Sequence, residues 1–114
     1  MPELKIFTVG GTIDKIYFDQ KSTYQVGDSK IVEVLQEANV TVEFDTETIM
    51  QKDSLDMNES DRQIILEKVT RAPYTQIVIT HGTDTMIDTA KTLSVIQDKT
   101  IVLTGSMQPA RFKN

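Results

Sequence analysis

The sequence predicts one α/β domain built on a doubly wound parallel sheet, with helices in layers on both faces. Four short apolar runs alternate with three stretches of helical periodicity, which gives the order βαβαβαβ. Such alternation with short connections implies parallel strands joined by right-handed crossovers. A chain of 114 residues is long enough to bury a core of its own, so we expect residues 1–114 to form a single Rossmann- or flavodoxin-like domain.

The four predicted strands share β-branched residues and flanking turn residues; they span 4–9, 40–44, 76–80 and 100–104. The first, third and fourth are almost continuously apolar, as is typical of strands covered on both faces. Residues 10–27 between the first strand and the first helix are the one long irregular stretch. Loops of that length in a compact domain are usually lids or binding loops.

Three helices are predicted from apolar residues spaced three and four positions apart. The first has Ile31, Val34, Leu35 and Ala38 on one face and ends at Asn39. The other two are described by their caps and by the residues expected on their apolar faces.

Asn58 is the expected N-cap of the second helix, which runs through Ile65, Val69 and Ala72 and stops at Pro73. The third helix begins near Thr85 and runs through Met86, Ala90 and Leu93. Thr85 and Asp88 match the capping-box pattern of a hydroxyl residue followed three positions later by an acid.

Composition excludes several classes of function. Seventeen acidic and twelve basic side chains leave a net charge of −5, and the basic residues are scattered, so we expect no nucleic-acid partner. The absence of cysteine excludes disulfides and thiolate chemistry, and a single histidine, His81, makes a metal site improbable. No apolar stretch approaches a membrane span. We therefore expect a cytoplasmic protein with no cofactor, no metal and no membrane partner.

Two glycine–threonine turns follow strands whose carboxyl ends should meet. If the strand order is 2-1-3-4, the order reverses between the first and third strands, and ligands bind at such a point. "GGT" (10–12) follows the first strand and "HGTDT" (81–85) follows the third. We therefore expect both turns, and the hydroxyls of Thr12 and Thr83, to face one crevice.

Each candidate segment has a structural alternative. Residues 10–15 lack the glycine spacing of a phosphate-binding loop, and Asp14 would repel a phosphate, which leaves a plain turn as the main alternative. Thr83 and Asp84 lie just outside the third helix and could form a proton relay and anion pocket, or Asp84 could add a capping contact. The segment 52–58 carries Ser54 on the crevice rim, or is a polar loop leading to Asn58.

Taken together, "TVGGTI", "YQVG", "KDSLDM", "THGTDTM" and "VLTGSMQPAR" occur in the order and rough spacing of the bacterial-type L-asparaginases. The chain resembles the N-terminal domain of that family over nearly its whole length. The resemblance implies an amidohydrolase that converts L-asparagine, or L-glutamine as the second candidate, into the acid and ammonia. It also implies a homo-oligomer that is a dimer or larger.

The resemblance assigns roles position by position. Thr12 is implied to be the nucleophile and Tyr24 its activating partner, while Thr83 and Asp84 form a second hydroxyl–carboxylate pair. The substrate-binding positions would be Gly11, Ser54, Leu55, Gly82, Thr83 and Asp84. A threonine hydroxyl is a weak nucleophile that needs a neighbouring base. A Tyr24 phenolate would cost about 4 kcal/mol at neutral pH and therefore needs cationic help.

The chain departs from the family pattern in ways that keep other functions open. Leu55 stands where many relatives have a polar residue, so one side-chain contact to the substrate should be missing. The family's completing lysine lies downstream of the "TGSM" strand, beyond Asn114, and Lys91 is not its equivalent. We therefore expect a single-domain relative or a fragment. The alternatives are a weakly active module that binds an amino acid or dicarboxylate, and a structural α/β subunit.

Overall fold

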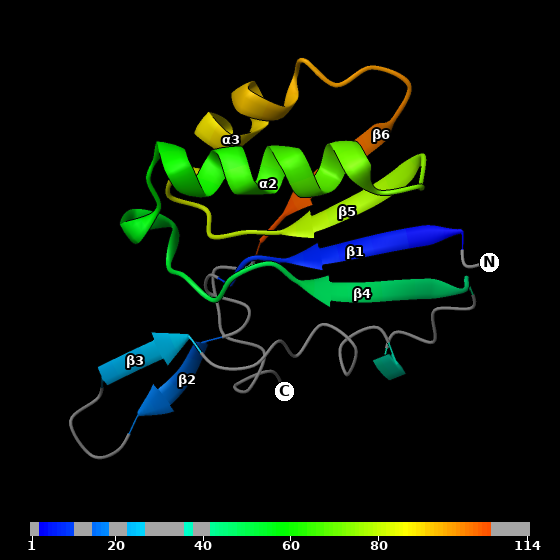
Figure 1. Cartoon of the computed structure of the whole chain (residues 1–114). Coiled ribbons are helices and arrows are strands. Elements are labelled where there is room, and N and C mark those ends of the chain that lie inside the picture. Colours follow the sequence, from blue (N-terminus) through cyan, green and yellow to red (C-terminus); the bar gives the residue numbers. More distant parts are fainter. Residues whose placement is uncertain (1–2, 11–14, 19–22, 27–35, 38–41, 106–114) are drawn as a thin grey trace.

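The computed structural model describes residues 3–10, 15–18, 23–26, 36–37 and 42–105. Its main feature is a four-stranded parallel sheet of β1 (Leu4–Thr8), β4 (Phe44–Thr48), β5 (Gln76–Thr80) and β6 (Thr100–Thr104). The strands lie in the order β4-β1-β5-β6 (Figure 1). This is the order 2-1-3-4 on which the crevice prediction was conditional, with the reversal between β1 and β5.

The two central strands form the middle of the core. Ile6 and Phe7 of β1 and Ile77 and Ile79 of β5 are almost completely buried. The parallel register pairs Phe7 with Ile79, and both side chains belong to the apolar cluster that the helices cover. Ile6 and Phe7 point to opposite faces of the sheet, so the prediction of cover on both faces is confirmed for β1. In β5 the buried Ile77 and Ile79 share one face, while Val78 on the other face is only partly buried. Burial of the isoleucine and phenylalanine side chains supplies much of the stabilising free energy.

Helix α2 (Glu59–Arg71) crosses the sheet and, with α3, covers one face of it (Figure 1). Asn58 is its N-cap, as predicted: the Asn58 side chain accepts a hydrogen bond from the Asp61 N–H, and the Asp61 carboxylate accepts one from the Asn58 N–H. Ile65 and Val69 point into the core. The helix ends at Ala72 because the residue before a proline disfavours helical backbone.

Helix α3 (Met86–Leu93) begins after Thr85, as predicted. The prediction that Thr85 and Asp88 form a capping box is wrong. Thr85 makes no side-chain capping bond and instead contacts a different loop, described below. The buried face of α3 carries Thr89 and Leu93, while Ala90 is exposed.

Two strand predictions need correction. The second strand was expected at 40–44, but β4 begins at Phe44, and the described residues Val42 and Glu43 are not in a strand. The polar sequence FDTET suits β4, because this strand lies at an edge of the described sheet and its acidic residues pair with a lysine of β1. The fourth strand, β6, is not covered on both faces: Thr100, Val102 and Thr104 are exposed.

The stretch 10–27 contains regular structure, so the prediction of an irregular loop is wrong for part of it. Strands β2 (Lys15–Phe18) and β3 (Thr23–Val26) pair antiparallel, with Tyr17 opposite Tyr24, in a hairpin separate from the main sheet (Figure 1). Of the predicted first helix, the structure describes only Gln36 and Glu37, which are helical. No helix in the described ranges is long and apolar enough to cross a membrane.

Candidate active site

The carboxyl edge of the sheet brings the expected segments together. Thr8 of β1 pairs with Thr80 of β5, which pairs with Thr104 of β6, so these strands end level with one another. The chain beyond each strand is tied to its neighbour: the Val9 N–H donates to the Thr80 carbonyl (3.1 Å), and the His81 N–H donates to the Thr104 carbonyl (2.9 Å). Residues 9–10 and 81–85 therefore leave adjacent strands at the same edge, as the switch-point argument requires.

Gly10 is the part of the first turn that the structure describes. It is buried and has φ of 109°, a conformation that glycine adopts without strain and other residues rarely adopt. Gly11 and Thr12 lie outside the described residues, as does the side chain of Tyr24, whose backbone belongs to β3. That the hydroxyls of Thr12 and Thr83 face one space thus remains a prediction.

Ser54 links the second predicted segment to the 81–85 turn. It opens the short 3₁₀ helix η3 (Ser54–Asp56), and its side chain is completely buried. Its hydroxyl oxygen accepts a hydrogen bond from the Asp84 N–H (3.1 Å), and the hydroxyl contacts Asp84 Oδ2 at 3.4 Å. The Thr85 hydroxyl donates to the Ser54 carbonyl at 2.9 Å. These contacts hold η3 against the start of α3.

Glycine is required where the two segments meet. A Cβ atom on Gly82 would lie 2.6 Å from Ser54 Oγ and 2.7 Å from Ser54 Cβ, closer than non-bonded atoms approach. Gly105, which sequence reasoning did not single out, has the same role behind the turn: its Cβ would lie 2.4 Å from the His81 carbonyl oxygen. The signal was present, because Gly105 directly follows the predicted strand 100–104, as Gly10 follows the predicted strand 4–9.

His81 anchors the turn from below. The side chain is completely buried; its Nδ1 lies 2.7 Å from the Gly82 carbonyl oxygen and its Nε2 lies 2.8 Å from the Thr89 hydroxyl. Because a carbonyl can only accept, Nδ1 carries the proton, and neutral Nε2 accepts from Thr89. Burial lowers the pKa of His81. The Gly82 bond opposes burial with a smaller effect, and the nearby Arg62 charge adds a still smaller lowering. His81 is therefore a packed, hydrogen-bonded residue, as expected.

Two polar residues of the turn are exposed. Thr83 and Asp84 lie at the surface, directly before α3, and Leu55 is 72% exposed on η3 beside Ser54. Asp84 is not the cap of α3, since Thr85 holds that position, so its carboxylate is not needed to start the helix. A carboxylate next to a helix N-terminus, with hydroxyls beside it, can hold an ammonium group and accept a proton.

The loop between β4 and α2 is held by its other polar residues. Asp53 is the N-cap of η3 and accepts from the Leu55 N–H, and Lys52 forms an ion pair with Asp61 at 2.9 Å. Although burial raises the pKa of Asp61, the bonds from Lys52 and the Asn58 N–H lower it overall. Asp53 thus fits the structural alternative of a polar loop, while Ser54 faces the turn.

The described part of the site thus joins Ser54, Gly82, Thr83 and Asp84 at the switch point of a parallel sheet, with Leu55 on its rim. Paired hydroxyl and carboxylate groups at that point are typical of the small-molecule sites of doubly wound α/β domains. The family described as "Asparaginase, N-terminal" matches residues 3–114. The chain therefore belongs to the asparaginase family and corresponds to its N-terminal part.

Known relatives agree with this assignment. The chain is 31% identical to L-asparaginase 2 of Bacillus subtilis and 31% identical to L-asparaginase 2 of Escherichia coli, in each case over 96% of this chain. A thermostable L-asparaginase from Thermococcus kodakarensis has a TM-score of 0.77 with 31% identity over 97% of this chain. A "Probable Cytoplasmic L-asparaginase" from Campylobacter jejuni has a TM-score of 0.80 with 28% identity over 96%.

The chain spans only about a third of these proteins: it covers 32% of the Bacillus relative, 34% of the Escherichia relative, and 36% and 37% of the two solved chains. The match therefore establishes the family and the fold.

Proposed function

We propose that this chain carries the nucleophile-bearing part of an L-asparaginase site and acts in hydrolysis of the L-asparagine side-chain amide. The observation that carries the proposal is the contact between Ser54 and Asp84, which brings the "KDSLDM" and "HGTDT" segments together at the switch point. Relatives that bear the name L-asparaginase support the reaction class.

In the proposed reaction the Thr12 hydroxyl attacks the side-chain amide carbon, and Tyr24 assists removal of the hydroxyl proton. The C–N bond then breaks, and the amide –NH2 group takes up the hydroxyl proton and leaves as ammonia. An acyl ester remains on Thr12. Water hydrolyses this ester to release aspartate and restore the hydroxyl. Thr83 and Asp84 form the second hydroxyl–carboxylate pair, and backbone N–H groups near Gly11 and Gly82 are suited to stabilise the oxyanion.

The described residues suggest how substrate is oriented. The Asp84 residue is exposed, and its carboxylate is proposed to accept hydrogen bonds from the substrate ammonium group. Ser54 is proposed to hold the substrate α-carboxylate; the 3.4 Å contact of its hydroxyl with Asp84 Oδ2 is the weaker of its two side-chain bonds, and this contact must exchange when substrate binds. Leu55 adds no hydrogen bond at the rim, so we expect weaker binding than a polar residue would give. L-Glutamine remains the second candidate substrate.

The proposal is tested by measuring ammonia release from L-asparagine and L-glutamine by the 114-residue chain, beside Thr12→Ala. Ammonia release by the chain and its loss in Thr12→Ala would support threonine-dependent hydrolysis. If calorimetry shows that aspartate binds but no ammonia is released, the module binds a dicarboxylate without turnover. Equal ammonia release from Thr12→Ala would remove Thr12 from the mechanism.

We also propose the cytoplasm as the compartment and a homo-oligomer as the assembly. The absence of cysteine fits a reducing compartment, and the printed name of the Campylobacter relative points the same way. Light scattering of the purified chain would test the assembly, and a single monomeric species at high concentration would contradict it.

A further inference from the structure

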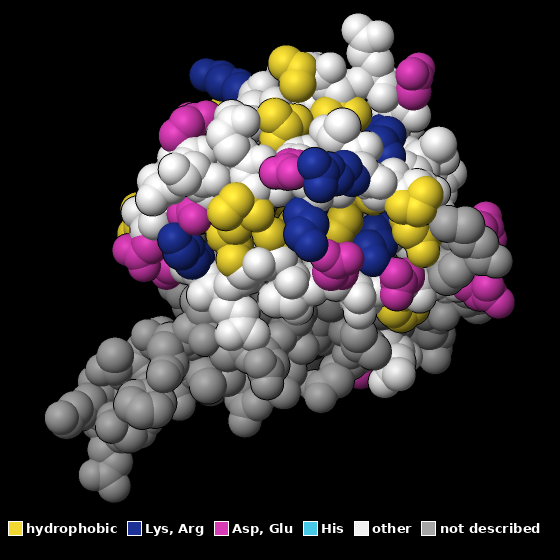
Figure 2. All heavy atoms as spheres, viewed as in Figure 1, with side chains coloured by type: hydrophobic (Ala, Val, Ile, Leu, Met, Phe, Trp, Pro, Cys, Tyr) yellow, Lys and Arg dark blue, Asp and Glu magenta, His cyan; other side chains and the backbone are white. Residues whose placement is uncertain are grey.

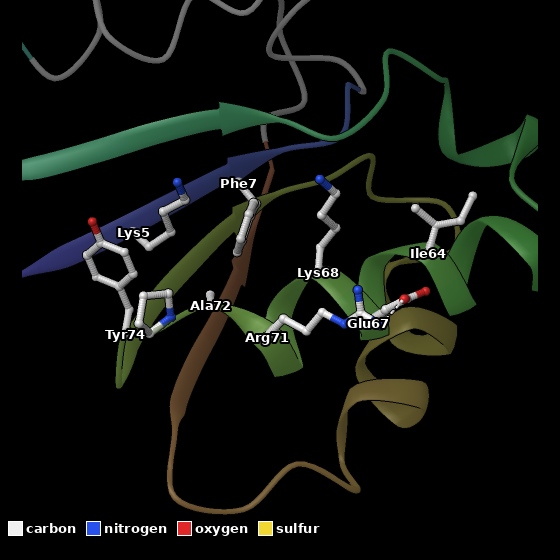
Figure 3. Close-up of a pocket in the computed structure, with 9 residues that line it drawn as sticks. Lys5, Phe7, Ile64, Glu67, Lys68, Arg71, Ala72 and Tyr74 are labelled. Carbon is white, nitrogen blue, oxygen red and sulfur yellow. Dashed lines mark ion pairs between the residues drawn. The ribbon is translucent and has the colours of Figure 1, made fainter.

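A hollow of about 370 Å³ lies between β1 and α2, away from the candidate active site. Its volume falls near the lower end of the roughly 300–1,000 Å³ typical of small-molecule sites. Figure 3 shows Lys5 and Tyr74 on one side of it, Lys68 and Ile64 on the other, Phe7 between them and Arg71 along the helix. The residues that line it are all absent from the candidate active site.

The inner surface of this hollow is apolar and aromatic. Phe7 is 1% exposed, and the rings of Phe7 and Tyr74 flank the Lys5 ammonium, with centroids 5.3 and 5.7 Å from Nζ. Ile64 is 46% exposed, so an apolar side chain remains open to solvent at the rim. A flat apolar group could therefore cover Ile64 and pack beside the two rings, which would remove apolar surface from water.

The charged side chains around the hollow differ in how many of their hydrogen-bond donors remain free. Its lining contains three cations, Lys5, Lys68 and Arg71, and one carboxylate, Glu67. Figure 2 shows basic, acidic and apolar side chains intermixed on this side of the molecule, viewed as in Figure 1. The local pairing of each charge therefore matters more than any broad electric field.

Arg71 and Lys68 have donors to spare. Among the residues that the structure describes, Arg71 forms an ion pair with Glu67 (2.8 Å), four positions earlier on α2. Both side chains are exposed, and such pairs contribute little free energy. Lys68 contacts Glu47 at 3.1 Å and is half exposed. A guanidinium has five N–H donors and an ammonium three, so each retains donors for a ligand.

The nearby acceptors are already engaged. Burial opposes the charge of Lys5, but its bonds to Asp45 (2.7 Å) and Glu47 (3.3 Å) outweigh this effect and raise its pKa. The Lys5 and Lys68 bonds correspondingly hold the pKa of Glu47 below its usual value. The two β4 carboxylates thus neutralise Lys5, while Arg71 and Lys68 at the mouth remain the groups most able to bind something new.

We propose that this hollow binds a small organic anion: a flat aromatic body with one carboxylate. The body would pack on Ile64 beside Phe7 and Tyr74, and the carboxylate would bind Arg71 and Lys68 at the mouth. The proposal does not depend on amide hydrolysis.

The test is an NMR titration of the ¹⁵N-labelled 114-residue chain with 2-naphthoate, compared with 2-naphthalenemethanol, which has the same ring system but no charge. Saturable shifts of the Phe7, Lys68 and Tyr74 amides are expected, with the alcohol bound about tenfold more weakly. Equal binding of the alcohol, shifts centred on residues 81–85, or no saturable shift at millimolar 2-naphthoate would overturn the proposal.

Three exposed substitutions sharpen the test. Arg71→Gln and Lys68→Gln should each weaken 2-naphthoate binding about five- to tenfold, because each removes one charge-assisted hydrogen bond while keeping a long helical side chain. Lys91→Gln removes a lysine from α3, outside the lining, and is the matched control. If Lys91→Gln weakens binding as much as Arg71→Gln, the effect is one of net charge and the site assignment fails.

Discussion

At the scale of single residues, Asp84 is the position where structural and functional roles can be separated. It touches Ser54, thirty positions earlier in the chain, through both its N–H and its carboxylate. The N–H bond fixes the turn and does not depend on the charge. The carboxylate is exposed, and the N-cap position of α3 belongs to Thr85, which makes no side-chain capping bond, rather than to Asp84.

Asp84→Asn should therefore leave stability almost unchanged while weakening ligand binding. Asparagine keeps the shape and an oxygen for the Ser54 hydroxyl, but it removes the charge that would pair with a substrate ammonium. Since a charge-assisted hydrogen bond is worth about 1.5–3 kcal/mol, aspartate affinity should fall at least about tenfold. A melting curve and a calorimetric titration measure the two effects, with Asp88→Asn on exposed α3 as control. Unchanged affinity with a lower melting temperature would assign Asp84 a structural role.

Gly82→Ala should destabilise the fold as well as the site. The added methyl group would lie 2.6 Å from Ser54 Oγ, so η3 or the turn has to move. We expect a loss of about 1–3 kcal/mol in the free energy of unfolding, measured with denaturant. Gly105→Ala should cost more, because its methyl group would meet the His81 backbone carbonyl, which moves less easily than a side chain. The reverse ranking would show that η3 is more rigid than its contacts suggest.

His81 should make the free energy of unfolding depend on pH below about 6.5. Burial lowers its pKa in the folded state below the ordinary value of 6.5, so the unfolded chain takes up a proton first as the pH falls. The free energy of unfolding should thus be constant with respect to this group above pH 6.5 and decrease below it. The lowered pKa values of Asp45, Glu47 and Asp61 act in the same direction, but only at more acidic pH.

His81 is the single histidine of the chain, so the NMR titration of one imidazole measures this effect directly. His81→Gln is the control: relative to its own value at pH 7.5, its stability should change less between pH 6.5 and 5. An imidazole that titrates at or above pH 6.5 in the folded protein would contradict the prediction.

At the scale of elements, the features that depend on residues close together in the sequence could be predicted. The Asn58 cap could be predicted because asparagine is a preferred cap and stands directly before the helical pattern. Its partner, Asp61, lies only three residues away on the same helix. The predicted capping box of Thr85 and Asp88 was wrong because the Thr85 hydroxyl bonds to the Ser54 carbonyl. No local pattern reveals that contact. Strand β4 was misplaced for the same reason, since its acidic residues suit a strand only because Lys5 lies beside them.

Asn58→Ala should destabilise α2 and, with it, the packing of Ile65 and Val69 on the sheet. The change removes one bond of the capping box and leaves the Asp61 N–H without its side-chain acceptor, which costs about 1 kcal/mol. Asn58→Ser should restore most of the loss, since serine caps nearly as well. Chemical denaturation measures both, with the exposed Ser60→Ala as control. An equal loss in the free energy of unfolding for Ser60→Ala and Asn58→Ala would mean that the cap does not stabilise the helix more than an ordinary exposed side chain.

At the scale of the whole molecule, the strand order 2-1-3-4 was assumed, and the shared edge at which residues 9–10 and 81–85 leave the sheet follows from it. Alternating strands and helices fix the parallel sheet, and the reversal between β1 and β5 fixes the edge where ligands bind. The Ser54–Asp84 contact and the packing of Gly105 could not be derived, because they depend on how separate loops dock. The roles of Thr12 and Tyr24 rest on the family resemblance and await the kinetic test.

The same topology predicts where the fold is most resistant to opening. β1 and β5 lie between other strands, whereas β6 is at an edge of the described sheet and exposes Thr100, Val102 and Thr104. The Thr100 N–H donates to Thr75 O, and amides alternate in direction along a strand, so those of Ile101 and Leu103 should point away from β5. Native-state hydrogen exchange should show the Phe7 and Ile79 amides opening only with global unfolding. The Ile101 and Leu103 amides should open with a free energy lower by about 2 kcal/mol or more. Equal protection at all four amides would show that the outer edge of β6 is paired with another segment or another copy, and the sheet would then have to be extended beyond these four strands.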